Sequence, residues 1–146
     1  MRTMRVHLAI ATLAVAFFVS GCGDLKDLPT APIDDGPPDS SATFTRVQTE
    51  VFKPNCALSG CHDAFTGQEG LVLAAGSSYA LLVDVQSSES SLDRIEPGSP
   101  EASYLYRKIT GASGIAGDRM PQGKQPLSAA NIKLVRDWIR RGAPND

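Results

Sequence analysis

Apolar residues recur at helical spacing near position 44, where the folded part of the chain is predicted to begin. The residues that share one face of this predicted helix, at spacing i, i+3, i+7 and i+8, are Phe44, Val47, Val51 and Phe52. Pro54 is expected to end the helix, because proline lacks a backbone donor and clashes with the preceding turn. The helix would therefore place Cys56 just past its C-terminus.

Three further helices are predicted downstream, separated by loops rich in serine, glycine and proline. A short one covers 77–85. The next covers 100–111, with Ser99 as its N-cap and a proline as its first residue. The last covers 129–141 and is capped by Ser128, and it ends at a glycine followed by a proline.

The beginning of the chain reads as an export signal, residues 1–21. Its apolar run, Leu8–Val19, is shorter than the roughly 20 residues that span a bilayer. The four residues that end at Cys22 resemble the lipobox of bacterial lipoproteins, whose cysteine becomes the lipidated first residue; an unmodified or disulfide-bonded thiol is the alternative. Residues 22–42 form a Pro/Asp-rich flexible tether with too few apolar side chains to fold. The folded domain is expected at 43–146.

Composition and charge add few constraints. The chain has 146 residues, enough for one domain, and its 42% hydrophobic and 21% charged residues are ordinary for a globular protein. Loss of Arg2 and Arg5 with the signal would move the formal net charge from −2 to −4. Nucleic acid is not an expected partner, since binding it calls for a basic face. Aromatic content is 6%, so a large apolar cofactor would help the chain fold.

One short segment, CALSGCH, places two thiols and an imidazole within residues 56–62. Each thiol can add across one vinyl group of a porphyrin as a thioether, and the histidine would then face the iron. The usual attachment signature has two residues between the cysteines, and here there are four. The segment predicts one covalent haem c, attached at Cys56 and Cys61 and ligated by His62.

The second axial ligand is predicted at Met120. After removal of the signal, His62 is the one histidine and Met120 the one methionine of the chain. Pro121 favours an extended backbone before it, and neighbouring glycines let the loop lie against a flat ligand. With both axial positions filled, the iron has no vacant site, which favours electron transfer and not enzyme activity. The donors considered for the haem carboxylates are Arg94, Arg119, Tyr104 and Trp138.

Together these motifs resemble the single-haem c-type cytochromes, close to the small planctomycete-type, class I-like domains of environmental bacteria. The resemblance covers about residues 44–146 and rests on CALSGCH, GLVL, PGSPEASYLYRKITG, RMP and PLSAANIKLVRDWIRRGAP. It implies an all-α fold, a small cytochrome c-like helical domain with long loops wrapped around one haem. It carries over Cys56 and Cys61 as attachment sites, His62 as proximal ligand and Met120 as distal ligand.

By this resemblance and the lipobox, the protein would be an electron carrier anchored by lipid in the cell envelope. It would lie on the periplasmic side or at the outer membrane, and its partners would be redox proteins of the envelope. Three other interpretations fit the same residues. Displacement of Met120 would leave a haem enzyme or sensor with an open distal site. Cys56, Cys61 and Met120 could bind Cu(I), which prefers soft ligands. The two cysteines could also form a structural disulfide.

Overall fold

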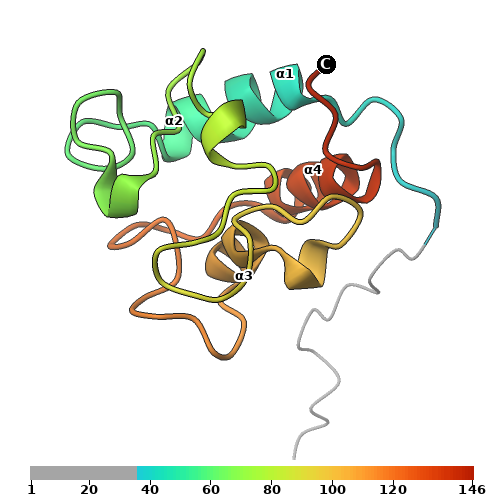
Figure 1. Cartoon of the computed structure of the whole chain (residues 1–146). Coiled ribbons are helices and arrows are strands. Elements are labelled where there is room, and N and C mark those ends of the chain that lie inside the picture. Colours follow the sequence, from blue (N-terminus) through green and yellow to red (C-terminus); the bar gives the residue numbers. More distant parts are fainter. Residues whose placement is uncertain (1–35) are drawn as a thin grey trace, which may run out of the picture. The chain divides into compact units, whose positions relative to one another are not determined.

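Residues 36–146 are described by a computed structural model of the chain (Figure 1). The predicted export signal 1–21, the lipid site Cys22 and the tether residues 22–35 lie outside the described residues. Within the described part, no helix is both long enough and apolar enough to cross a bilayer.

The first helix consists of three consecutive parts, which are α1 (Phe44–Arg46), the π-helical turn η2 (Val47–Phe52) and α2 (Lys53–Asn55). Its start confirms the prediction. Thr43 is the N-cap, and its side-chain oxygen accepts the backbone N–H of Arg46. The predicted apolar face is also buried. Its members in η2, the aliphatic and aromatic residues of that turn, are at most 1% exposed.

The helix continues one residue past Pro54, where the sequence predicted its end. In η2 the N–H groups reach one residue further back than in an α-helix, as from Lys53 to the Gln48 carbonyl. This wider turn gives the proline ring more room against the carbonyls behind it, which relieves the clash that usually ends a helix. Cys56 follows directly as the C-terminal cap.

Short turns take the place of helices in the long stretch that follows. Three single turns occur there, η3 (Gln68–Gly70), η4 (Tyr79–Leu81) and η5 (Pro100–Ala102). The helix predicted at 77–85 is therefore reduced to η4. Two isolated β-bridges join the same stretch, Val83 with Ile95 and Gln86 with Asp93.

The next helix, α3 (Tyr104–Thr110), begins later than the helix predicted at 100–111. Ser103 has an extended backbone and separates η5 from α3. Its hydroxyl donates to the Ser99 carbonyl and accepts the Glu96 N–H, so this side chain stabilises the break. The predicted N-cap Ser99 makes no side-chain capping bond.

The last helix, α4 (Ala129–Arg140), confirms the prediction closely. The Ser128 hydroxyl accepts the Asn131 N–H at 3.1 Å. Trp138 is fully buried, and its ring centroid lies 5.4 Å from that of Phe44. The first and last helices are therefore in contact (Figure 1).

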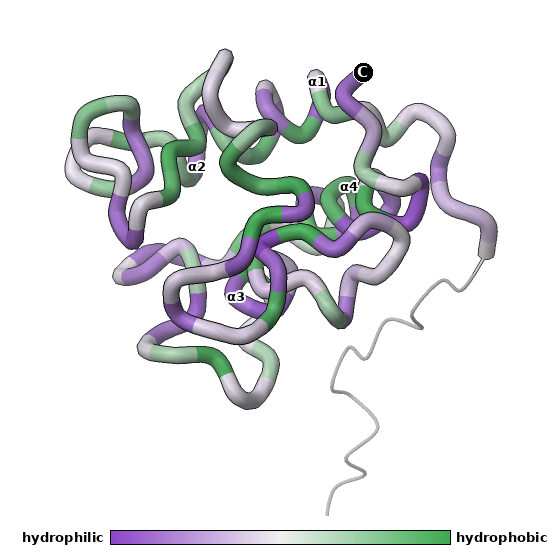
Figure 2. Tube along the Cα trace, viewed as in Figure 1, coloured by the Kyte–Doolittle hydropathy of each residue, from purple (hydrophilic) through white to green (hydrophobic). Residues whose placement is uncertain are grey.

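The core is shared by the first helix, α3, α4 and the chain between them. Figure 2 shows hydrophobic colouring along the first helix, along α4 and in the intervening chain. The largest fully buried apolar side chains are Phe52, Leu82, Ile95, Trp138 and Ile139. Ala42 is also fully buried, so packing already begins at the last residue of the predicted tether.

The expected all-α, cytochrome c-like fold is wrong. Helices of every kind account for 36% of the described residues and strand for 4%. Between α2 and α3 the described chain contains no helix longer than a three-residue turn. Serine, glycine and proline recur every few residues there and favour turns over helices. The domain is built mainly of loops, held together by three helices.

The last residue of the sequence completes the start of the first helix. The Asp146 carboxylate accepts the Phe44 N–H at 2.9 Å, and its backbone carbonyl accepts the Thr45 N–H at 2.9 Å. Arg141 pairs with the same carboxylate at 2.9 Å. These contacts satisfy N–H groups that a helix start leaves without partners. The bond from Phe44 first, and then Arg141, lower the pKa of Asp146.

Asp146→Ala is expected to lower the free energy of unfolding by about 1 kcal/mol, a typical value for a helix cap. Asp146→Asn keeps an acceptor and should lower it less. Because folding lowers the pKa of Asp146, its carboxylate stabilises the fold above the unfolded pKa of about 4. That contribution is lost as the pH falls through the folded pKa. Urea unfolding at pH 7 and pH 2.5 measures both effects, and an equal deficit at the two pH values would contradict the capping role.

Candidate functional site

A cavity of about 440 Å³ lies beside the segment that follows α2. Its volume falls within the roughly 300–1,000 Å³ of typical ligand and cofactor sites. The lining includes every residue that the sequence predicted for haem, Cys56, Cys61, His62 and Met120. Two segments far apart in the sequence therefore meet at one cavity.

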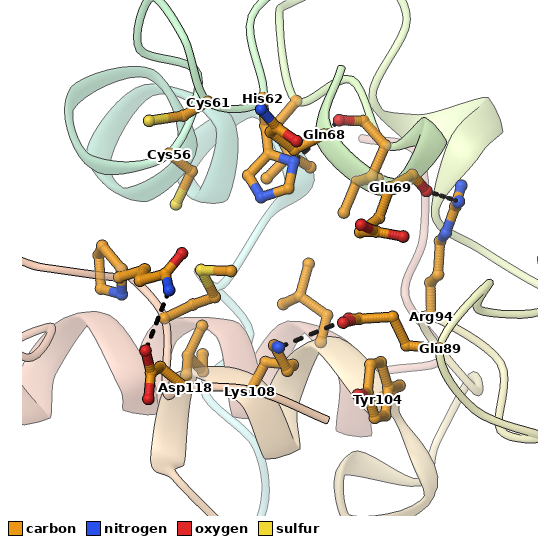
Figure 3. Close-up of a pocket in the computed structure, with 18 of the residues that line it drawn as sticks. Cys56, Cys61, His62, Gln68, Glu69, Glu89, Arg94, Tyr104, Lys108 and Asp118 are labelled. Atoms are coloured by element: carbon orange, nitrogen blue, oxygen red, sulfur yellow. Dashed lines mark hydrogen bonds and ion pairs between the residues drawn. The ribbon is translucent and has the colours of Figure 1, made fainter. Parts of the chain in front are cut away.

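Two walls face each other across this cavity (Figure 3). One wall carries Cys56, Cys61 and His62, and the opposite wall carries Lys108 on α3. Met120 belongs to the wall of α3, because its backbone N–H donates to the Lys108 carbonyl at 2.8 Å. His62 and Met120 thus approach the cavity from different walls, as two axial ligands of one iron must.

The four-residue spacer between the cysteines forms a turn. The Cys61 N–H donates to the Leu58 carbonyl at 2.9 Å, and Gly60 takes a φ of 79°, which glycine adopts without strain. Across this turn, the Cys56 carbonyl accepts the His62 N–H at 3.2 Å. The turn brings both thiols to the same cavity although the spacer is longer than usual.

One hydrogen bond orients the imidazole of His62. Its Nδ1 lies 2.9 Å from the Leu71 carbonyl oxygen. A carbonyl can only accept, so Nδ1 carries the proton and Nε2 is the nitrogen available to a metal. The backbone supports this contact, because the Leu73 N–H donates to the His62 carbonyl at 2.8 Å. A metal-binding histidine usually has such a partner on its other nitrogen.

Cys56 and Cys61 are free thiols, so the disulfide considered from the sequence is not formed in this structure. Burial first, and then the neighbouring Cys61, raise the pKa of Cys56 to about 12. The Cys56 thiol is therefore protonated at neutral pH. No cluster of three or more His, Cys, Asp or Glu suited to a metal occurs in residues 36–146.

Apolar and charged side chains both line the cavity. The apolar lining residues are Phe52, Leu71, Leu73, Leu105 and Ile109. Glu69, Glu89 and Arg94 lie on one side in Figure 3, and Asp118 lies on the other.

Two of the four donors considered for haem carboxylates line the cavity. Arg94 is 9% exposed and donates to the carbonyls of Leu81 and Glu69, at 2.8 and 3.0 Å. A guanidinium has five N–H donors, so others stay available to an anion. Tyr104 is 4% exposed and its hydroxyl accepts the Ala116 N–H at 2.9 Å.

The other two donors do not line the cavity. A Cβ added at Gly111 would come within 3.0 Å of the Arg119 side chain, so Arg119 packs against the end of α3. Trp138 donates its indole N–H to the Pro144 carbonyl at 2.9 Å within the core. Trp138 is therefore a packing residue.

Sequence reasoning missed Lys108, which lines the cavity and is 7% exposed. Its Nζ donates to the Ala116 carbonyl at 2.7 Å and pairs with Glu89 at 3.5 Å. The available signal was its spacing from Tyr104, because residues four apart lie on the same side of a helix.

Comparisons with known proteins add no assignment. The chain matches no protein-family model, no curated protein and no solved structure. The resemblance to single-haem c-type cytochromes therefore rests on the motifs of the sequence.

Alkylation of Cys56 in the cofactor-free protein is expected to be roughly a hundredfold slower at pH 8 than in the urea-unfolded chain. A pKa of about 12 leaves little thiolate at that pH, and the greater nucleophilicity of a basic thiolate offsets part of this loss. The rate should keep rising above pH 9, where an ordinary cysteine levels off. Peptide-resolved mass spectrometry follows Cys56 separately, and a plateau near pH 9 would contradict a buried thiol.

Proposed function

We propose that this protein is a monohaem c-type electron carrier of the bacterial cell envelope. The observation that carries the proposal is the single cavity lined by Cys56, Cys61, His62 and Met120. The orientation of His62 by the Leu71 carbonyl adds to it, because this leaves Nε2 free. The proposal rests on these groups and not on a helical fold.

The two cysteines would hold the porphyrin. Each thiol adds across one vinyl group, with the sulfur bonding to one carbon and the hydrogen to the other, so the addition involves no net oxidation. His62 would bind the iron through Nε2, and Met120 through its sulfur. A haem ligated in this way supplies one-electron chemistry between ferric and ferrous iron, and a methionine ligand raises its reduction potential.

The remaining lining residues would set the environment of the cofactor. Phe52, Leu105 and Ile109 present apolar surface and exclude water, which lowers the local polarity around the iron. Arg94 and Lys108 are cations that are less than 10% exposed and line the same cavity. Arg94 would offset part of the negative charge of the porphyrin carboxylates, whereas Lys108 is already paired with Glu89.

We also propose that the domain is anchored to a membrane by lipid on Cys22. The support is the export signal 1–21 and the lipobox-like segment that ends it. The domain would then exchange electrons with redox proteins of the envelope, on the periplasmic side or at the outer membrane.

Met120→Ala is expected to abolish the weak long-wavelength sulfur-to-iron absorption band of the oxidised protein while the haem stays attached. The band requires the thioether ligand, and the mature chain contains no other methionine. Gln125→Ala, at an exposed position that follows in the chain and does not line the cavity, is the matched control and should keep the band. Absorption spectra of the oxidised proteins decide this. A wild-type protein without the band would instead favour a haem enzyme or sensor with an open distal site.

Cys56→Ala and Cys61→Ala should each shift the reduced pyridine haemochrome to longer wavelength, because one vinyl group then stays conjugated with the ring. The double variant should release its haem into acidified organic solvent. These outcomes follow from the turn that brings both thiols to the cavity. If one single variant keeps the wild-type spectrum, the four-residue spacer permits only one thioether.

A further inference from the structure

Three hydrogen bonds hold the loop that carries Met120 against α3. The Ala116 N–H donates to the Tyr104 hydroxyl at 2.9 Å, and the Ala116 carbonyl accepts from Lys108 Nζ at 2.7 Å. The Met120 N–H donates to the backbone carbonyl of Lys108 at 2.8 Å. Tyr104 and Lys108 are four residues apart on α3, so their side chains project together and hold both polar groups of one loop residue.

The end of α3 makes the Lys108 carbonyl available to this loop. In a continuing helix, that carbonyl would accept the N–H of Ala112. Gly111 instead takes a φ of 73°, and the N–H groups of Gly111 and Ala112 both donate to the Arg107 carbonyl. The Lys108 carbonyl is then free to accept the N–H of Met120.

Lys108 also links α3 to the serine-rich segment 86–91. Its Nζ pairs with the Glu89 carboxylate at 3.5 Å, and the side chain of Lys108 is 9% exposed (Figure 3). The adjacent Ser88 hydroxyl donates to the Glu69 carbonyl at 3.1 Å, which ties the segment to the other wall of the cavity. A buried ammonium needs partners of this kind, so its orientation is fixed by Glu89 and Ala116 together.

We propose that Lys108 is the positioning residue for Met120. Its side chain fixes the first half of the loop at Ala116, and its backbone fixes Met120 itself. The inference rests on the proposed haem function, in which Met120 is an axial ligand. Loss of the Lys108 side chain leaves the Ala116 carbonyl and the Glu89 carboxylate without their partner, and Met120 then turns away from the cavity more often.

Amide hydrogen exchange tests the contact between Lys108 and the loop without using any property of a cofactor. Lys108→Leu removes the ammonium and keeps an apolar side chain, and Lys53→Leu, at an exposed position of α2, is the matched control. Both variants and the wild-type protein are purified, with the complete processed chain, from cells that attach haem. Peptides covering 112–120 should exchange about tenfold faster in Lys108→Leu and at the wild-type rate in Lys53→Leu. Equal exchange in the two variants overturns the proposal.

Tyr104→Phe provides a second, milder variant in case Lys108→Leu does not fold. It removes one hydroxyl, and with it the other side-chain bond to Ala116. The same peptides should again exchange faster than in wild type. Unchanged exchange rates in Tyr104→Phe overturn the role of the Tyr104 hydroxyl in holding the loop.

The sulfur-to-iron band reports on Met120 directly when haem is attached. Lys108→Leu should lose at least half of this band, and Lys108→Arg should retain most of it, because a guanidinium can still donate to Ala116 and pair with Glu89. A full band in Lys108→Leu overturns the positioning role. A wild-type protein whose denatured mass includes no haem rejects the proposed function instead, and the exchange rates still decide whether Lys108 holds the loop.

Discussion

The hydrogen bond from His62 Nδ1 to the Leu71 carbonyl determines which nitrogen the imidazole offers to the cavity. A carbonyl cannot donate, so the proton must sit on Nδ1, and the lone pair of Nε2 remains free. The bond depends on local backbone geometry, because the Leu73 N–H donates to the His62 carbonyl and holds the two segments side by side. In the proposed haem site, this orientation would direct Nε2 toward the cavity that the two thiols and Met120 also line.

Each wall of the cavity has anchoring contacts of its own. The wall of the cysteines follows a helix whose start is capped by Thr43 and Asp146. The wall of Met120 is a loop bonded to α3 through Lys108. Both helices contribute to one apolar core together with α4. The segment 86–91 also joins the two walls, through the Lys108–Glu89 pair and the bond from Ser88 to the Glu69 carbonyl.

The sequence predicted those structural features that depend on residues close together in the chain. The helix start near residue 44, the cap at Ser128, the inward faces of the two helices and the grouping of Cys56 with His62 could all be read directly. The break at Ser103 could not, because its hydroxyl bonds to backbone groups of the preceding loop. The all-α expectation came from the family resemblance, and it failed because the chain between α2 and α3 forms only three-residue turns. Burial of Lys108 was also hidden, since lysine is rarely buried.

The central claim is that sulfur joins a porphyrin to this polypeptide at the cavity between these two walls. Intact mass of the wild-type protein after denaturation tests it most directly, using protein from cells that attach haem to c-type cytochromes. The account predicts one species heavier than the processed polypeptide by the mass of one haem, because thioether bonds survive unfolding. A colourless preparation with the mass of the polypeptide alone would contradict it.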